Sequence, residues 1–534
     1  MSKAKAPDIG SISAAQLQEL KAELKEPLSP PLFQRVEWLL ETLEFLLGVI
    51  EQKTHSVARL KRMLFGHQTE KASNVLSGAR AGAGAAGRTS PKTKAKGHGR
   101  KGAKDYPGAK TVSVPHPEYQ AGQVCPKCGK GKLYLFKDPA RLIRIVAQPI
   151  CAATGYELQR LRCVLCGALF TAPAPAEAGV NKYHSSVGTM LAIMRYGVGL
   201  PMYRMDKWQN YFGIPLPAGT QWQLMNAACE PIEGVHEELI KAAAQGSLVH
   251  NDDTTMWVQP LAREIADSGA TEEKSKRTGI FTTGIVSLTG DRQIALFFTG
   301  QKHAGENLTD LLGRRSPDLG KPLQMCDALS RNESKTVATT LCNCILHGRR
   351  NVVDIAEKFP QECGKVIDTL AEVYRIDGRA RKEKLCNAQR LALHQEHSRP
   401  LMDNLHAWMK EQFDRRKVEP NSSLGGAIAY MIKFWIPLTR FLEVPGAPLD
   451  NNIVERALKM AILHRKNSLR YKTSRGAKVG DIFMSLIQTC QLNRVNPFEY
   501  LMALQENAEV VKKDPTRWLP WNYRQAPVVV TDTS

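Results

Sequence analysis

Residues 450–476 read DNNIVERALKMAILHRKNSLRYKTSRG, and the rest of the chain is interpreted outward from this stretch. From Arg456 to Gly480 there are eight basic residues and no acidic residue, so Glu455 is the carboxylate at the head of a basic run. A run of this kind suits a polyanion. Its basic residues are Arg456, Lys459, Arg465, Lys466, Arg470, Lys472, Arg475 and Lys478.

The same stretch carries the signals of a helix start, with Asp450 as a favourable N-cap. Helical spacing then places Asn452, Glu455 and Lys459 on one face, an arrangement that can hold a metal-bound carboxylate beside a phosphate contact. The alternative is a solvated basic helix in which Glu455 forms an ordinary salt bridge.

The composition describes a large, basic, globular chain. Its 534 residues are 43% hydrophobic, enough for roughly three or four domains. Lys and Arg number 73 against 52 Asp and Glu, a net charge of +21, which favours a nucleic acid partner over a membrane surface. The most hydrophobic stretch, AIAYMIKFWIPL, is too short to span a bilayer, and MSKAKAPDIGSIS has no apolar signal core. We therefore expect a soluble intracellular protein without membrane contact.

The N-terminal part of the chain has two characters. Residues 33–65 carry a heptad repeat that predicts a coiled coil, and hence a homo-oligomer, within an N-terminal segment 1–70; an amphipathic helix packed on its own domain is the alternative. A Gly/Ala-rich and then basic segment predicts a flexible linker over 71–115, which either grips DNA backbone or acts as a passive tether. The heptad positions are Val36, Leu39, Leu43, Leu46, Ile50, Val57, Leu60 and Leu64.

Two Cys-x-x-Cys pairs, each followed by Gly, are the most specific local signal. They contain Cys125 and Cys128, and then Cys163 and Cys166. Four thiolates on two such knuckles form a closed tetrahedral site typical of structural Zn²⁺, in a domain placed at 116–178. Chance pairing or a redox role is the alternative, and the other cysteines are expected to be reduced thiols.

Residues 184–245 have the apolar spacing of several short helices, punctuated by GIPLP. We assign them to a helical region 179–246. It is either a helix-turn-helix reader of DNA or a helical spacer packed on the next domain, because the turn chemistry is unspecific.

Three β-rich stretches follow, SLVHNDDTTMWVQ, TGIFTTGIVSL and RQIALFFTG, and predict an antiparallel meander that begins a mixed sheet. Two more strands are expected at KPLQMCDAL and CNCILHGRR. Asp252 and Asp327 lie on the first and fourth strands, which are neighbours in a ribonuclease H-like sheet. With a third acid from a helix they can hold two Mg²⁺ ions about 3.5–4 Å apart for phosphoryl transfer. Alternation turns Asp253 to the opposite face, so Asp252 is preferred as the first ligand.

Basic residues also follow the last expected strand. His347, Arg349 and Arg350 stand where this strand should end, and we expect them to contact backbone phosphate. Cys342, Cys344 and His347 raise the alternative of a metal site, but alternate cysteines on a strand are more often part of a core.

Several motifs occur in the order found in one known family. RLKRMLFGHQTEK resembles its zipper-to-linker junction, CPKCG and RCVLCG its zinc-binding segment, and GLPMYRMDKWQNYFGIPL its helical region. HNDDTT stands where that family has Ala-Asp-Glu-Thr, ILHGRRNV where it has Ala-His-x-Arg-Arg, and DNNIVERALK with HRKNSL where it has Asn-Asn-x-x-Glu-Arg and Arg-Lys-Asn. By these motifs the chain is similar to transposases of the insertion sequence 66 family, which belong to the Asp-Asp-Glu class.

The resemblance implies the site and the activity. Asp252, Asp327 and Glu455 would be the catalytic acids and would hold two Mg²⁺ ions, which Mn²⁺ can replace. The protein would bind terminal inverted repeats, cleave the DNA there and join the end to target DNA. Double-stranded DNA and accessory proteins of the element would be its partners, in the cytoplasm of a bacterium and associated with the nucleoid.

Taken together, these features predict a multidomain α+β protein with an N-terminal coiled coil, a zinc-binding β segment and a helical region. A ribonuclease H-like catalytic domain would follow at 247–485 with a helical insertion at about 353–445, and a C-terminal helix and tail at 486–534. The alternative function is a catalytically inactive DNA-binding repressor or architectural protein derived from such a transposase. Mg²⁺-dependent cleavage of DNA that carries the element's ends separates the two.

Overall fold

The computed structural model describes residues 14–25, 27, 29–42, 113–135, 148–162, 169–268 and 279–526. The chain divides into two compact units. The larger unit comprises Met1–Ala85, Tyr183–Met202 and Gly219–Ser534, and the smaller unit comprises Ala86–Lys182 and Tyr203–Ala218.

The described N-terminal segment is helical. It contains α1 (Ala14–Glu23) and a second helix over residues 30–42, and Lys21 pairs with Glu37 at 2.9 Å and with Glu41 at 3.0 Å. Most of the expected heptad seam, from Leu43 onward, lies outside the described residues, as does nearly all of the linker. The coiled coil therefore stays a prediction.

The smaller unit contains the first cysteine knuckle and a two-stranded antiparallel ribbon of β1 (Arg160–Arg162) and β2 (Leu169–Thr171). It also contains most of helix α5 (Met202–Tyr211). The Gln209 side chain fixes a neighbouring segment, because its amide donates to the carbonyl of Cys151 at 2.8 Å and accepts from its N–H at 3.2 Å. A short 3₁₀ helix η3 (Ala176–Ala178) follows β2.

A five-stranded mixed sheet organises the larger unit. Its order is β5-β4-β3-β6-β7; the β3–β4 and β4–β5 pairs are antiparallel, and the β3–β6 and β6–β7 pairs are parallel. The predicted meander is confirmed, and β3, which carries Asp252, is a neighbour of β6. Asp327 was expected on the fourth strand but follows directly after β6. The strands are β3 (Leu248–Thr255), β4 (Phe281–Thr289), β5 (Arg292–Gly300), β6 (Leu323–Cys326) and β7 (Thr340–Asn343).

One expected strand is shorter than its pattern suggested. In CNCILHGRR the strand ends at Asn343, and helix α10 (Ile345–Val353) begins two residues later. The apolar run has strand propensity, but the helix begins after Cys344, which occupies the N-cap position without a side-chain capping bond. The backbone N–H of Ile345 instead bonds to the carbonyl of Leu449 at 3.0 Å. The prediction of a strand through His347 was therefore wrong.

The two faces of the sheet are covered by different helices. Helix α15 (Asn452–Ser468) packs on β3 and β4. It approaches so closely that a Cβ on Gly284 would lie 2.9 Å from the side chain of Leu458. Helices α7 (Glu233–Ala244) and α9 (Ala304–Leu312) also contact the sheet. The Asn307 amide of α9 donates to the Thr283 hydroxyl at 2.8 Å, so consecutive β4 residues meet α9 and α15.

Helix α16 (Ser474–Leu492) lies along the outer edge of β5. Polar atoms of Asp481, Ser485, Thr489 and Asn493 accept hydrogen bonds from alternate backbone N–H groups of β5, at 2.7 Å for Thr299, 3.0 Å for Phe297, 3.0 Å for Ala295 and 3.1 Å for Gln293. Four residues of a helix rise about 6 Å and two residues of a strand rise about 6.8 Å, so a polar side chain on each turn of α16 can meet every second N–H of β5.

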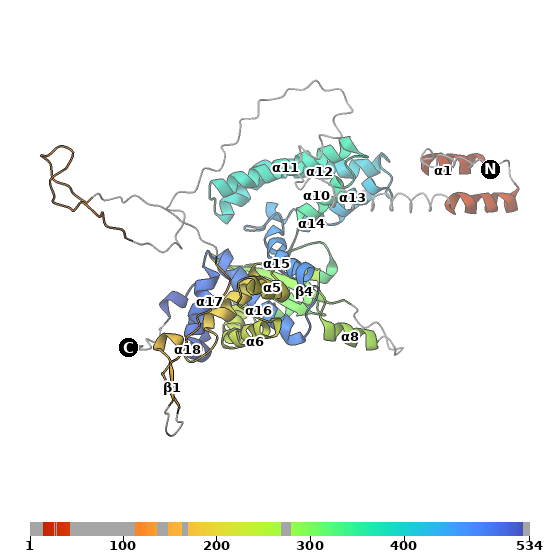
Figure 1. Cartoon of the computed structure of the whole chain (residues 1–534). Helices are drawn as coiled ribbons and strands as arrows, with labels where there is room; N and C mark the ends of the chain where they lie inside the picture. The colour runs from red at the N-terminus through yellow and green to blue at the C-terminus, as the bar shows by residue number, and fades with distance from the viewer. Residues whose placement is uncertain are drawn as a thin grey trace, which may run out of the picture. The chain divides into compact units, whose positions relative to one another are not determined.

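Residues 353–445 are mostly helical, as predicted. Helices α11 and α12 run side by side (Figure 1). The helices of this region share an apolar core with sheet residues such as Met325 and Cys342. They are α11 (Pro360–Lys382), α12 (Asn387–Asp414), α13 (Ser423–Lys433), α14 (Trp435–Leu438) and the 3₁₀ turn η7 (Arg440–Leu442).

The helices predicted before the sheet are present, and further helices follow α16. None of the described helices is both long and apolar enough to cross a bilayer. The remaining elements are α4 (Ser185–Ala192), the π turn η4 (Ile193–Gly197), α6 (Ala218–Cys229), η5 (Glu230–Ile232), α8 (Gln259–Ser268), η6 (Ser330–Asn332), α17 (Pro497–Glu506), α18 (Ala508–Lys513), η8 (Pro515–Trp518) and η9 (Tyr523–Gln525).

Candidate active site

The β3–β4 register places Asp252 on the face of the sheet that α15 covers. Asp252 pairs with Gly284, and paired residues of an antiparallel ladder point to the same face. Gly284 is the residue that α15 approaches through Val454 and Leu458. Glu455 follows Val454 on the first turns of this helix, so the first and third acids come to the same side from a strand and a helix.

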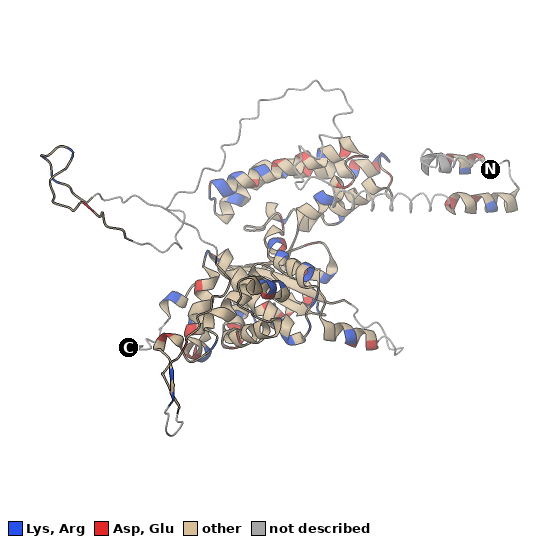
Figure 2. Ribbon diagram, in the orientation of Figure 1, with Lys and Arg blue, Asp and Glu red and all other residues tan. Residues whose placement is uncertain are grey.

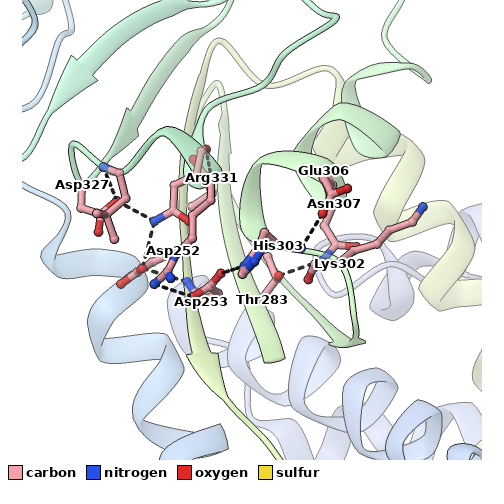
Figure 3. Close-up of polar contacts among 12 residues, drawn as sticks. Asp252, Asp253, Thr283, Lys302, His303, Glu306, Asn307, Asp327 and Arg331 are labelled. Atoms are coloured by element: carbon pink, nitrogen blue, oxygen red, sulfur yellow. Dashed lines mark hydrogen bonds and ion pairs between the residues drawn. The ribbon is translucent and has the colours of Figure 1, made fainter. Parts of the chain in front are cut away.

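Asp327 follows directly after β6, the parallel neighbour of β3. The buried amide of Asn332 joins the two aspartates: its Nδ2 donates to Asp327 Oδ1 at 2.6 Å and lies 3.5 Å from Asp252 Oδ1. The N–H of Leu329 also donates to Asp327 Oδ1, at 3.2 Å. Figure 3 shows Asp252 and Asp327 on one side of the strand.

The electrostatics of these acids reflect their proximity. Burial raises the pKa of Asp252 most, and the negative charges of Asp327, Asp253 and Glu455 raise it further, to about 7. Burial also raises the pKa of Asp327. A carboxyl that loses its proton only near neutral pH, beside other carboxylates, is stabilised in its charged form by a bound cation.

Asp253 belongs to the opposite face, as strand alternation predicted. It pairs with Thr283, its side chain is 3% exposed, and its carboxylate lies 3.0 Å from His303 Nδ1 and 3.7 Å from Arg331. Figure 3 shows it pointing toward His303, away from Asp327. The structure thus places Asp252, and not Asp253, with Asp327 and Glu455.

Glu455 has a second set of neighbours, Cys344, which the sequence analysis assigned to a core, and His347, which it expected to contact phosphate. The ligand atoms of Cys344, His347 and Glu455 all lie within 4.8 Å of one another, the tightest set of three metal-capable side chains in the described part of the chain. Cys342, by contrast, is a fully buried core residue outside this set.

Asn451 is the N-cap of α15 and positions this helix, whereas the sequence analysis placed the N-cap one residue earlier, at Asp450. Its Nδ2 donates to the carbonyl of Asn251 at 3.1 Å, its Oδ1 lies 3.0 Å from His250 Nδ1, and its backbone N–H donates to Cys344 Sγ at 3.3 Å. The first of two adjacent asparagines, four residues before Glu455, was the available signal. These bonds set Glu455 against β3.

The basic residues predicted to contact DNA fall into two groups. Arg465 bonds to Thr254 and Thr255 at the end of β3, Arg475 bonds to Asn226 and Glu233, and Arg349 is buried. Figure 2 shows Lys and Arg along α11 and α12 as well as on α15, so basic charge extends beyond the run after Glu455. The exposed members of the run are Arg456, Lys459, Lys466, Arg470, Lys472 and Lys478, and Lys478 pairs with Glu233.

The first cysteine knuckle has the local geometry of a metal-binding turn. Gly129 has a φ of +65°, and its N–H donates to the carbonyl of Cys125 at 2.8 Å. Hydrogen bonds from the backbone at Gly131 and Lys130 lower the pKa of Cys128, which favours the thiolate that a metal needs. Cys163 and Cys166 lie outside the described residues, so the four-cysteine zinc site stays a prediction.

Comparison with known proteins gives relatives along most of the chain. The curated protein y4hP of Sinorhizobium fredii, uncharacterized, is 26% identical over 392 residues, which is 69% of this chain and 67% of y4hP. Another uncharacterized protein of that organism, y4jD, is 24% identical over 387 residues, 68% of this chain and 71% of y4jD.

A family model described as "Transposase IS66 family" matches residues 182–479, more than half of the 534 residues. The matched span begins just before α4 and ends within α16, so it includes the whole sheet and all three acids. The chain therefore belongs to the IS66 family of transposases.

Proposed function

We propose that the protein is a DNA transposase that binds the terminal inverted repeats of a bacterial insertion sequence, cleaves the DNA there and transfers the end to target DNA. The observation that carries the proposal is the meeting of Asp252 and Asp327, bridged by Asn332, with Glu455 on one face of the sheet. The order of strands and their directions support a ribonuclease H-like catalytic domain within the larger unit.

The acids fit divalent cations. Their ligands are carboxylate oxygens, the type that Mg²⁺ and Mn²⁺ prefer, and Glu455 Oε1 is buried without a hydrogen-bond partner among the described residues. Two ions about 3.5–4 Å apart spread their ligands over more space than one ion does, so three acids need not form a single tight set. Such ions would activate the attacking hydroxyl and stabilise the leaving oxygen.

The chain's own residues hold the reacting groups in place. Asn332 fixes both aspartates in one orientation, which lowers the cost of bringing their charges together. Asp252 keeps its proton up to about pH 7 when no positive charge is near. The exposed basic residues of α15 and beyond, with His347 and Arg350, would contact phosphates and set the position of the strand.

The other domains would serve the same function. The cysteine knuckles would hold structural Zn²⁺, the helices around 179–246 would read the DNA ends, and the N-terminal coiled coil would join subunits of a homo-oligomer. We also propose that accessory proteins of the element take part as partners and that the protein associates with the nucleoid.

The test is cleavage of linear DNA that carries the element's ends, with Mg²⁺, with Mn²⁺ and with a chelator. Asp252→Asn, Asp327→Asn and Glu455→Gln should each lose cleavage while binding to end DNA persists, because binding depends on Lys and Arg. Asp310→Asn is the matched control, since this acid on α9 is 58% exposed and pairs with Lys302. End binding by a parent chain that never cleaves, with either metal and with accessory proteins, would instead favour the repressor or architectural alternative.

A further inference from the structure

A second cluster of potential ligands adjoins the acids and has a different chemistry. It consists of Cys344, which is fully buried, His347, and Glu455. Sulfur, imidazole nitrogen and one carboxylate oxygen form a ligand set that suits a borderline divalent cation of the Zn²⁺ class, and does not suit Mg²⁺.

The backbone holds these three residues together before any ion binds. Cys344 is the N-cap of α10, and His347 lies three residues later on the first turn of that helix. The N–H of Asn451, at the N-cap of α15, donates to Cys344 Sγ at 3.3 Å, so the starts of both helices meet here. Helix N-termini favour negative charge, which the Glu455 carboxylate supplies. Burial raises the pKa of the Cys344 thiol, so its sulfur adds negative charge only when a bound cation displaces the proton.

Two polar atoms in the cluster lack partners. Glu455 Oε1 and His347 Nδ1 are buried and have no hydrogen-bond partner among the described residues. Buried polar atoms are nearly always satisfied, so an orphan on each of two facing side chains points to a missing ligand. A tetrahedral ion with bonds of about 2.0–2.3 Å needs its ligand atoms roughly 3–4 Å apart, a small contraction from the observed set.

We propose that Cys344, His347 and Glu455 bind a Zn²⁺-class cation, with three protein ligands and a fourth position for water or another oxygen ligand. The site is separate from the cysteine knuckles and does not depend on DNA cleavage. It shares Glu455 with the acids of the proposed active site. The Glu455 carboxylate can therefore serve as a ligand either with the oxygen ligands Asp252 and Asp327 or with the sulfur and nitrogen ligands Cys344 and His347.

A structural explanation competes with this proposal. Cys344 packs in the apolar core of the helical insertion. Burial raises the pKa of Asp327, and His347 opposes that rise, as a counter-ion would. Under that explanation the cluster binds no ion. The neighbouring core cysteine, Cys342, is therefore the matched control for Cys344.

The experiment uses Co²⁺ as a probe, bound to the full chain in which Cys125, Cys128, Cys163 and Cys166 are replaced by serine. We expect about one equivalent of Co²⁺ bound with a thiolate-to-cobalt charge-transfer band. Adding Cys344→Ser should abolish the band, and His347→Gln should weaken binding by about tenfold or more. Cys342→Ser should leave both the band and the affinity unchanged.

A second measurement uses a chain in which Cys344, His347 and Glu455 are unchanged, so its result cannot be attributed to misfolding caused by a substitution in the cluster. In the same serine background, X-ray absorption at cobalt should show one sulfur neighbour together with nitrogen or oxygen neighbours. A shell without sulfur, or a band that persists in a folded Cys344→Ser chain, would overturn the site, whatever the outcome of the cleavage test.

Discussion

Two aspartates of the larger unit, the partly buried Asp252 and the buried Asp481, share a pKa of about 7 for different reasons. At Asp252, burial is joined by the negative charges of Asp327, Asp253 and Glu455. At Asp481, burial alone raises the pKa, and the hydroxyl and backbone N–H of Thr299 oppose it by donating hydrogen bonds at 2.6 and 2.7 Å. Asp252 stands among like charges, whereas both oxygens of Asp481 have partners.

The difference shows that a shifted pKa identifies a functional acid only through its cause. A cation would relieve the repulsion at Asp252 and has nothing to relieve at Asp481. Asp481 is expected to act in the fold, as a member of the ladder that α16 forms along β5. The roles of Asp252 and Asp481 can therefore be distinguished by the rate of DNA cleavage, by the pH dependence of stability and by stabilisation with Mg²⁺.

The largest expected contrast is in DNA cleavage. Asp252→Asn removes a proposed metal ligand. A loss of several kcal/mol of transition-state stabilisation should reduce the cleavage rate by at least about 10³-fold. Asp481→Asn should change the rate by less than about threefold, since it lies outside the site. Single-turnover cleavage of end DNA measures both. Equal losses in two folded variants would erase the distinction.

The next contrast is in the pH dependence of stability. Because the folded pKa of Asp481 is about 7, above its ordinary 3.8, its protonated form favours folding. That contribution is full below about pH 4 and is lost as the pH rises through about 7. Between about pH 5 and pH 8, the free energy of unfolding of the parent should fall by roughly 3 kcal/mol relative to Asp481→Asn. Denaturant unfolding at the two pH values tests this, and parallel profiles would contradict it.

Stabilisation of the folded chain by Mg²⁺ should depend on Asp252 and not on Asp481. At about 100 times its dissociation constant, a ligand that binds only the folded chain stabilises it by about 3 kcal/mol. We expect this gain in the parent and in Asp481→Asn, and a smaller gain in Asp252→Asn. Thermal unfolding with and without Mg²⁺, at an ionic strength held constant, gives the comparison. An equal gain in all three chains would remove Asp252 from the metal site.

The smallest expected effect concerns the ladder itself. Thr489→Val keeps the shape of the side chain but leaves the N–H of Ala295 unpaired, at a cost of about 1–2 kcal/mol of stability. Thr369→Val is the matched control, because that exposed hydroxyl bonds only to the carbonyl of Lys365 four residues earlier. The control should change the unfolding free energy by less than about 0.5 kcal/mol. A silent Thr489→Val would mean that water replaces the lost bond.

Much of the fold could be predicted from the sequence because its signals are local. Stretches of high β propensity bounded by turn residues mark β3, β4 and β5, and motif order indicates that Asp252 and Asp327 belong to adjacent strands. The start of α10 could not be predicted, because its cap is a cysteine and the bond from Ile345 to Leu449 joins distant segments. Element type follows from propensity only where such contacts agree with it.

The details of the candidate site depend on long-range contacts. Asn332 has no sequence feature that links it to Asp252, yet its amide reaches both aspartates. Arg465 is expected to contact phosphate like its neighbours, and the sequence did not indicate that it also bonds to the end of β3. The sequence identifies a residue as basic, but it does not show which group that residue contacts in the folded chain. Helix α16 likewise continues past residue 485, where the sequence analysis ended the catalytic domain.

The helix along β5 also bears on how copies of the chain can associate. An open edge strand invites another strand to pair with it, which leads to domain swapping or fibrils. Here α16 occupies the N–H groups of β5, and at the other edge Arg440 donates to the carbonyl of Leu341 on β7 at 3.2 Å. Growth of the sheet from one subunit into the next is blocked along β5. An assembly that holds two DNA ends would then be joined through helices and loops, which can part after strand transfer without disturbing the sheet.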